Sequence, residues 1–289
     1  MRKISINCWG QVDVEERRHY RGKAGPREQA KIHVDVRDVV CSCDVALLAS
    51  QYLRGEGVDT RVFGDAVTAV DRALELALSL MVDEETAILN ISIPGKHVSD
   101  DHTEMVVLSC TVSLSIVENG KLMFEFTPKE KLAIAVKYKT MGSGLYKEGS
   151  KEGCVSKQIS AFFFFRNAVK WITMINADKS EDILGEISEI KSQCYNNLAL
   201  YHLHRHHYKL SVAAATTVLI MDNKNVKALY RRAVANTALQ NYEIAIDDIE
   251  AALAIDPNNG PVKKQCDIIR RKQRAMSVKY ANALKKLFS

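Results

Sequence analysis

The C-terminal half of the sequence carries two groups of side chains that could bind a ligand. Lys227 and Arg231 are four residues apart, so on a helix they lie one turn apart and point to the same side. His202 and His206 have the same spacing, which also occurs in helical metal sites. No carboxylate or cysteine stands beside these histidines, and imidazoles also favour helix C-termini. The sequence therefore predicts no metal site and no cofactor.

Charge is distributed unevenly along the chain. Residues 1–126 carry 14 lysines and arginines against 20 acidic residues, whereas residues 127–289 carry 26 against 15. The C-terminal half should therefore attract acidic partners. Its basic residues are scattered along predicted helices without interleaved aromatic residues, so a scaffold for nucleic acid is the weaker alternative.

The elements that must position these cations follow from a repeated pattern. Residues that recur 34 positions later are Tyr208 (as Tyr242), Leu219 (as Leu253), Asp222 (as Asp256) and Asn225 (as Asn259). This period is typical of the tetratricopeptide repeat, a pair of antiparallel helices. The later copy places Ala233, Ala245 and Ala252 where the helices must approach closely, and Pro257 ends it. Such pairs stack into a solenoid whose concave face can receive a peptide.

The first repeat and the end of the chain depart from this regular length. Residues 135–175 fit a repeat with Gly142 at its small position, once an insertion of seven residues at 150–156 lengthens the turn between its helices. Phe162–Phe165 cover nearly a full turn, and we favour internal packing over an exposed contact patch for them. Residues 261–287 predict a basic capping helix. Apolar side chains that could cover the last repeat are Ile268, Ile269, Met276, Tyr280, Leu284 and Leu287.

The N-terminal half shows the pattern of an α+β domain. Residues 106–116 alternate between apolar and polar side chains, which predicts a strand with one buried face, and further strands are expected within 34–48 and 86–93. Between these two lies one amphipathic helix. Its apolar stripe contains Val70, Leu74, Ala77, Leu78 and Met81. We therefore expect an antiparallel sheet wrapped on one helix in residues 1–126, and three helical repeats with a capping helix in residues 127–289.

Cysteine content and the N-terminal sequence indicate the compartment. Seven cysteines at irregular spacings favour reduced thiols, and the first residues lack the apolar stretch of a secretory signal. The sequence contains no apolar run as long as a membrane-spanning helix. A cytoplasmic protein, which could also enter the nucleus, is the expectation.

Over residues 33–287 the chain resembles the FKBP-type immunophilins that carry a tetratricopeptide domain. The matching segments are YKTMGSGLYKEG, NNLALYHL, KALYRRA and KYANALKKLF in the helical half, with a fainter match in the N-terminal half at Val62-Phe63-Gly64, LALSLM and the strand after Glu85. The resemblance implies an FKBP-like domain followed by a solenoid of three tetratricopeptide repeats.

The resemblance also locates a prolyl isomerase pocket that the family lines with aromatic side chains. Three of its aromatic positions fall on Ser42, Leu74 and Cys110. The family's Phe-Asp pair falls within residues 51–59, which contain no Phe, and its Tyr-Gly lip is replaced by residues 94–100. We therefore expect no catalytic residue and no enzyme activity; the alternative is a divergent but active peptidyl-prolyl cis-trans isomerase.

In the helical half the resemblance implies a peptide clamp. The family uses lysine, asparagine and arginine side chains on the first helix of each repeat to hold the terminal carboxylate and last Asp of a chaperone tail. These positions fall on Lys139, Asn197, Lys227 and Arg231, and the accessory position in the first repeat is Ser143 where the family has Asn.

The resemblance implies a protein-binding adaptor or co-chaperone that binds the C-terminal tail of the ninety-kilodalton heat-shock chaperone. A narrower likeness to an insect FKBP-like protein adds a casein-kinase-I-type clock kinase as a possible client, although no residue of this sequence encodes a preference for a kinase. Nucleic acid and membranes are not expected as partners.

Overall fold

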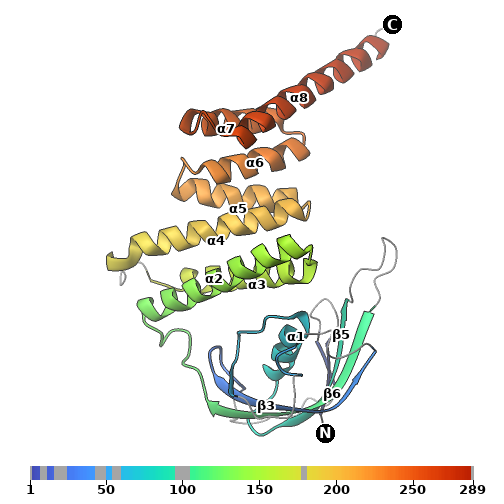
Figure 1. Cartoon of the computed structure of the whole chain (residues 1–289), viewed down its shortest axis with the longest axis vertical. Helices are drawn as coiled ribbons and strands as arrows, with labels where there is room; N and C mark the ends of the chain where they lie inside the picture. Colours follow the sequence, from blue (N-terminus) through green and yellow to red (C-terminus); the bar gives the residue numbers. More distant parts are fainter. Residues whose placement is uncertain are drawn as a thin grey trace. The chain divides into compact units, whose positions relative to one another are not determined.

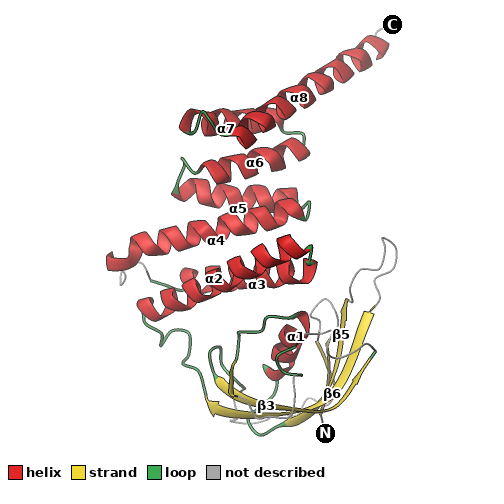
Figure 2. Cartoon of the chain, viewed as in Figure 1, coloured by secondary structure: helices red, strands yellow, loops and turns green. Residues whose placement is uncertain are grey.

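The computed structural model describes residues 2–6, 12–15, 25–42, 50–53, 60–94, 105–176 and 181–287. By its internal contacts the chain divides into two compact units, Met1–Thr127 and Pro128–Ser289. The N-terminal unit combines a sheet with a helix, and the C-terminal unit is built from helices (Figure 2). The predicted fold class, an α+β domain followed by tetratricopeptide-like helix pairs, is confirmed.

Within the described residues of the N-terminal unit, six strands form one sheet (Figure 1). They are β1 (Arg2–Ile6), β2 (Val12–Glu15), β3 (Lys31–Cys41), β4 (Thr60–Val62), β5 (Thr86–Pro94) and β6 (Met105–Glu118). Their order is β2-β1-β5-β6-β3-β4. Neighbouring strands run antiparallel except β1 and β5, which are parallel.

One face of this sheet packs against α1 (Ala69–Leu78). On β6 the buried residues Leu108, Cys110, Val112 and Leu114 alternate with half-exposed ones, as the sequence pattern predicted. Leu74 of α1 is fully buried in the same core. The helix begins where the side chain of Thr68 accepts a hydrogen bond from the amide of Asp71, which satisfies one of the free donors of its first turn.

The sequence did not predict strands β1 and β2. The β1 segment RKISI has only two fully inward positions, Ile4 and Ile6, so its alternation is too short to stand out. Because β1 pairs with β5, it adds these side chains to the core. The strand expected within 34–48 corresponds to β3, which ends at Cys41; residues 43–49 lie outside the described residues.

The described residues of the C-terminal unit form three helix pairs and a final helix (Figure 1). The helices are α2 (Pro128–Glu152), α3 (Val155–Thr173), α4 (Leu184–His204), α5 (Tyr208–Met221), α6 (Val226–Ala238), α7 (Tyr242–Ile255) and α8 (Gly260–Leu287), with a 3-10 turn at Glu181–Ile183. Each helix contacts the next, and the first helices of successive pairs, α2, α4 and α6, also contact one another. None of the described helices combines the length and apolar character needed to cross a membrane.

Small residues allow the helices of each pair to approach closely. Ala233, Ala245 and Ala252 are fully buried, as predicted. A Cβ atom at Gly142 of α2 would lie 2.8 Å from Cε1 of Phe165 and 3.2 Å from the carbonyl oxygen of Ala161 on α3. A larger residue at this position would require the Phe165 ring or α3 itself to shift.

The expectation of a longer turn in the first pair is wrong. Most of residues 150–156 extend the two helices instead, because α2 continues to Glu152 and α3 begins at Val155. Gly153, at a φ of +65°, ends α2 in a backbone conformation that favours glycine, and the amide of Cys154 bonds back to the carbonyl of Gly149 at 2.8 Å.

Phe162–Phe165 mostly pack internally, which was the favoured alternative. Phe164 and Phe165 are buried, Phe162 packs partly against the helical core, and Phe163 remains 36% exposed. Among its described side chains, the capping helix covers the last pair through those at its beginning, where Val262, Cys266 and Ile269 are buried. The expected contact of Tyr280 is wrong, since its side chain is 63% exposed; the side chains of Leu284 and Leu287 lie outside the described residues.

Candidate peptide-binding site

Five predicted site residues lie on the first helices of the three pairs. Lys139 and Ser143 are on α2, Asn197 is on α4, and Lys227 and Arg231 are on α6. Asn197 and Arg231 occupy equivalent positions, 34 residues apart. We call the side of α2, α4 and α6 that carries these residues the clamp face.

Arg231 joins two first helices of the clamp face. Its Nη1 donates to the backbone carbonyl of Asn196 at 2.8 Å and to Oδ1 of the same residue at 3.0 Å. Burial lowers the pKa of the guanidinium from its ordinary value, although an arginine stays charged at neutral pH. Because one nitrogen makes both bonds, donors on the other nitrogens are left for a ligand.

The two lysines of the clamp face have no acidic partner among the described residues. Lys227 is exposed and Lys139 is half-buried. The positive charge of Lys139 acts on the thiol of Cys194 on α4, where burial nevertheless raises the thiol pKa to about 12. Lys139 thus lies beside α4, close to the residue three positions before Asn197 on that helix. An ammonium group without an acidic partner among the described residues can take up a carboxylate from a ligand.

Asn197 and Ser143 differ in whether their side chains already make a hydrogen bond within the described residues. Asn197 is half-buried, and no hydrogen bond of its side chain occurs within the described residues. The Ser143 hydroxyl is exposed but donates to the backbone carbonyl of Lys139 at 2.9 Å, within its own helix. The structure therefore places Asn197 next to the residue that Arg231 contacts across α4 and α6, whereas the hydroxyl of Ser143 is directed back onto α2.

Sequence reasoning missed Asn196, the residue that holds Arg231 in place. Besides accepting from Arg231, the Asn196 side chain donates to Oδ1 of Asn225 at 3.3 Å, and Asn225 caps the start of α6. A possible signal was the Asn-Asn pair in the second repeat, but the sequence alone gives no reason to assign a role to each member.

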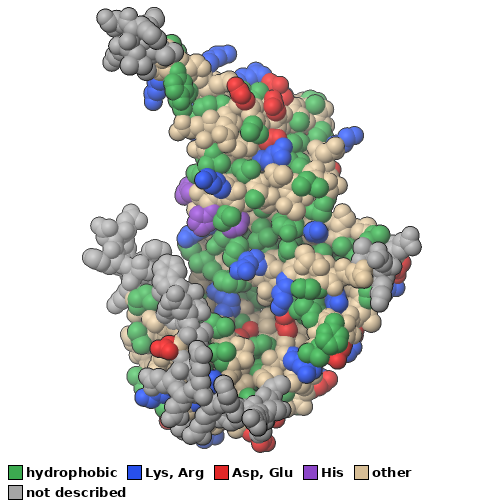
Figure 3. Space-filling model, turned by 180° about the vertical axis from the view of Figure 1, so that it is seen from behind, with side chains coloured by type: hydrophobic (Ala, Val, Ile, Leu, Met, Phe, Trp, Pro, Cys, Tyr) green, Lys and Arg blue, Asp and Glu red, His purple; other side chains and the backbone are tan. Residues whose placement is uncertain are grey.

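A second feature of the clamp face that the sequence did not indicate is a tyrosine-histidine pair. The hydroxyl of Tyr146 on α2 lies 2.7 Å from Nδ1 of His204 on α4, and the rings are stacked at 6.2 Å between centroids. The charge of Arg231 acts on both side chains. Figure 3 shows histidine side chains gathered at one place on the helical unit, next to lysine or arginine side chains.

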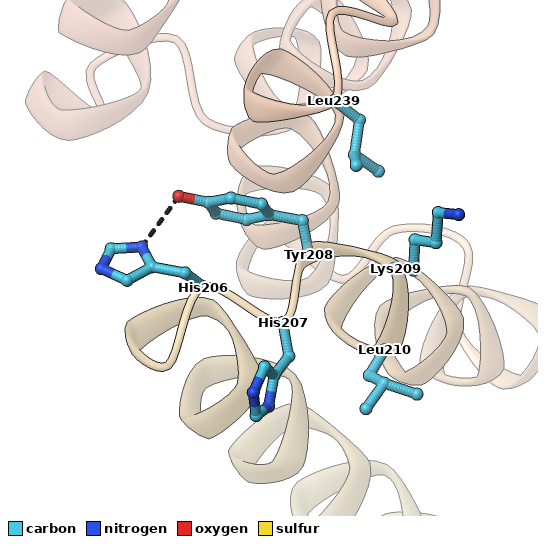
Figure 4. Close-up of a pocket in the computed structure, with 6 residues that line it drawn as sticks. All are labelled: His206, His207, Tyr208, Lys209, Leu210 and Leu239. Carbon is cyan, nitrogen blue, oxygen red and sulfur yellow. Dashed lines mark hydrogen bonds between the residues drawn. The ribbon is translucent and has the colours of Figure 1, made fainter.

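A separate shallow cavity of about 360 Å³ lies at the turn between α4 and α5 (Figure 4). It is lined by His206, His207, Tyr208, Lys209, Leu210 and Leu239. Nδ1 of His206 is 2.8 Å from the Tyr208 hydroxyl, so this histidine already has a partner. The described residues contain no group of three side chains arranged to hold a metal ion.

In the N-terminal unit the positions predicted for an isomerase pocket lie in different surroundings. Leu74 and Cys110 are buried in the core, and burial raises the pKa of the Cys110 thiol to about 12. Ser42 is exposed, and its hydroxyl accepts from the amide of Val107 at 3.0 Å. Residues 54–59 and 95–100, which include most of the predicted Phe-Asp and lip segments, lie outside the described residues.

Beside Leu74, α1 carries two buried carboxyls that the sequence reasoning also missed. Asp71 is fully buried and accepts from the Ser50 hydroxyl and, at 3.0 Å, from the amide of Gln51. Glu75 accepts from the Tyr52 hydroxyl at 3.0 Å, and burial raises the pKa of Glu75 to about 7. Both acids fix residues 50–52 to the helix.

Comparison with known proteins agrees with this architecture. The family model for the tetratricopeptide repeat matches residues 226–259, which contain α6 and α7. The peptidyl-prolyl cis-trans isomerase FKBP4 of Mus musculus is 27% identical over 180 residues, which cover 61% of this chain and 38% of the mouse protein. FK506-binding protein 59 of Drosophila melanogaster is 26% identical over 233 residues, covering 78% of this chain and 50% of that protein.

Among solved structures, the C-terminal tetratricopeptide domain of a Plasmodium falciparum FK506-binding protein is similar, with a TM-score of 0.48 and 23% identity, over 54% of this chain and 99% of that one. The sheet-and-helix unit followed by tetratricopeptide pairs defines a two-domain class of protein. The chain is similar to the FKBP-type immunophilins that carry tetratricopeptide repeats, and it spans less than half the length of the mouse relative.

These relatives correct one prediction. The sequence led us to expect that the chain is not an enzyme, because the pocket positions fall on Ser42, Leu74 and Cys110. The mouse relative is named as a peptidyl-prolyl cis-trans isomerase, which contradicts that expectation. The substitution of three aromatic positions was insufficient ground for excluding the activity, since much of the predicted pocket lies outside the described residues.

Proposed function

We propose that this protein is an adaptor of the co-chaperone type, whose helical unit binds the acidic C-terminal tail of a heat-shock chaperone on the clamp face. The observation that carries the proposal is that the cations of the clamp face are available to a ligand. Lys139 and Lys227 have no acidic partner in the described part of the chain, and Arg231 is held in place by bonds from one nitrogen, which leaves its other donors for a ligand. Asn197 adds an amide between them.

A terminal carboxylate and the side chain of a last Asp present two negative groups at a fixed spacing. Cations from the first and third pairs, with an amide from the second, complement such a ligand. Each charge-assisted hydrogen bond contributes about 1.5 to 3 kcal/mol when it is partly desolvated. The family resemblance points to the ninety-kilodalton heat-shock chaperone as the source of this tail.

Calorimetric titration with the peptide Met-Glu-Glu-Val-Asp tests the proposal. Lys227→Ala should weaken binding by about tenfold to a hundredfold, because it removes one such bond. Lys209→Ala is the matched control, since this exposed lysine lies on the second helix α5 and its loss changes the net charge equally. Equal binding of a C-terminally amidated peptide would show that the clamp face serves another ligand.

Peptidyl-prolyl isomerisation by the N-terminal unit is a second candidate function, favoured by the names of the relatives. A proline-switch peptide assay on the full chain, with an active family member as the positive control, tests it. Saturable turnover supports this candidate, and turnover no faster than the uncatalysed reaction rejects it.

The narrower partner remains a prediction. A likeness to the insect protein bride of doubletime suggests a casein-kinase-I-type kinase as client, and none of the relatives named above bears on it. We propose a cytoplasmic location, with the nucleus as the alternative. Affinity capture with the wild-type chain and the Lys227→Ala variant separates partners that need the clamp face from partners that do not.

A further inference from the structure

The first helices carry more side chains on the clamp face than the five predicted ones. Tyr146 is seven residues after Lys139 on α2, and His204 is seven residues after Asn197 on α4. Seven residues are close to two helical turns, so each side chain lies on the same side of its helix as the clamp residue. The clamp face therefore continues from the predicted cations to the tyrosine-histidine pair.

His204 is held across the two pairs in either protonation state. The Tyr146 hydroxyl can donate to the neutral ring and can equally accept from the protonated ring, because Nδ1 then carries a hydrogen. The stacked rings fix the orientation in both cases. Protonation therefore adds a positive charge at a fixed place without the loss of this contact.

The groups that face His204 are cationic or neutral. From α2 it meets Tyr146, from α6 the charge of Arg231, and from the turn after α4 the imidazole of His206. No acidic side chain interacts with His204 within the part of the chain that the structure describes. Partial burial, with the charges of Arg231 and His206, lowers the pKa of His204 below its ordinary value. An anionic ligand at this place would supply the missing negative charge.

We propose that His204, positioned by Tyr146 beside Arg231, is a specificity-determining residue that binds an acidic side chain preceding the last residue of the peptide and takes up a proton as it does so. This inference rests on the proposed function, because it assigns a further contact to the same peptide. A carboxylate close to the ring favours the protonated form, so the complex binds more protons than the free protein. Binding should therefore strengthen as the pH falls.

The experiment measures proton uptake by the full chain during calorimetric titration, in two buffers of different ionisation enthalpy at about pH 6.5. Wild-type protein should take up a substantial fraction of a proton for each Met-Glu-Glu-Val-Asp peptide, up to about one. Its affinity should rise about threefold to tenfold from about pH 8 to about pH 5.5, the size expected for a partly exposed ion pair. A peptide with both glutamates replaced by glutamine should show neither effect.

Two variants separate this role from a structural one. His204→Gln keeps a side chain that can bond to the Tyr146 hydroxyl but does not titrate, so proton uptake should disappear while binding at about pH 8 is retained. Tyr146→Phe keeps the stacked ring but releases the imidazole, and should reduce the uptake. His33→Gln is the matched control, because His33 also lies within hydrogen-bonding distance of a hydroxyl, that of Thr60, but is on β3 of the N-terminal unit.

Uptake that persists in His204→Gln would overturn the inference, and so would an equal pH dependence for the glutamine peptide. Binding of wild-type protein that needs the free C-terminus but is independent of pH would also overturn it and leave the proposed function intact. An amidated peptide that binds as well as the free one would instead remove the proposed function, and the inference with it.

Discussion

Arg231 and Arg232 are adjacent on α6 but lie on different sides of the helix, and they differ in whether an acidic side chain of the protein neutralises their charge. Arg232 donates to both carboxylate oxygens of Asp248 on α7, at 2.9 and 2.6 Å, and to the Thr216 hydroxyl on α5 at 3.3 Å. The Asp248 side chain is only 4% exposed. Toward the second helices, then, charge is neutralised within the protein, whereas the clamp-face cations have no acidic partner among the described residues. The first arrangement stabilises the fold, and the second leaves the cations available to the ligand that we propose.

The largest expected effect comes from breaking the paired side of this comparison. Arg232→Ala would leave the Asp248 carboxylate buried without its cation, which costs about 3 to 5 kcal/mol of unfolding free energy. Denaturant unfolding monitored by circular dichroism measures the loss. Lys227→Ala should change stability by less than about 0.5 kcal/mol in the same experiment, because its side chain is exposed. Comparable losses in the two variants would contradict the distinction between the two sides.

The buried carboxyl of Glu75 on α1 should make the stability of the protein depend on pH. Burial raises the pKa of Glu75 to about 7 from an ordinary value near 4.5, so the folded state holds its proton more tightly than the unfolded state does. The associated stability is complete below about pH 4.5 and is lost as the pH rises through about 7, a change of about 3 kcal/mol. Unfolding of wild type and Glu75→Gln between about pH 5 and about pH 8 should show the decline only in wild type. An equal decline in both proteins would assign it to another group.

The repeats were predictable because the helix pairs impose a fixed period and small residues at close approaches, which Ala233, Ala245 and Ala252 display directly. The contact between Arg231 and Asn196 was not, because it depends on how far α6 is displaced along α4, which no local pattern encodes. The seven residues at 150–156 were expected to lengthen a turn, but helix propagation adds a hydrogen bond for each residue, and α2 continues to Glu152. Tyr280 was expected to cover the last repeat, although its burial requires a neighbouring helix at that point of α8, which the sequence does not show.

A smaller effect distinguishes the packed side of α2 from its exposed side. Gly142→Ala should destabilise the protein by about 1 to 2 kcal/mol, because the added Cβ would lie too close to Phe165 and to the backbone of Ala161. The energetic cost of these contacts should exceed the gain in helix propensity. Gly144→Ala is the matched control on the same helix, because no neighbouring atom lies within 4 Å of the place that its added methyl group would occupy. It should stabilise by up to about 1 kcal/mol, through propensity alone. Thermal unfolding of the two variants measures both changes in stability. A stabilised Gly142→Ala protein would mean that α3 can shift to accommodate the methyl group at little energetic cost.

The smallest expected effect concerns the neighbour of Gly142 on the clamp face. The Ser143 hydroxyl is exposed and bonds back to the carbonyl of Lys139, so it offers little to a ligand. Ser143→Asn restores the longer amide that the family resemblance places here, and a side-chain amide can reach beyond the helix to donate to a peptide carboxylate. We expect affinity for Met-Glu-Glu-Val-Asp to rise about twofold to fivefold, the yield of one partly exposed hydrogen bond, with no change in unfolding free energy beyond about 0.5 kcal/mol. Titration calorimetry measures the increase in peptide affinity caused by Ser143→Asn. The same titration of the double variant with Lys227→Ala measures this increase without the clamp lysine. Because the gain depends on a peptide already seated on the clamp face, a rise that is equally large for an amidated peptide would place the ligand elsewhere on the helical unit.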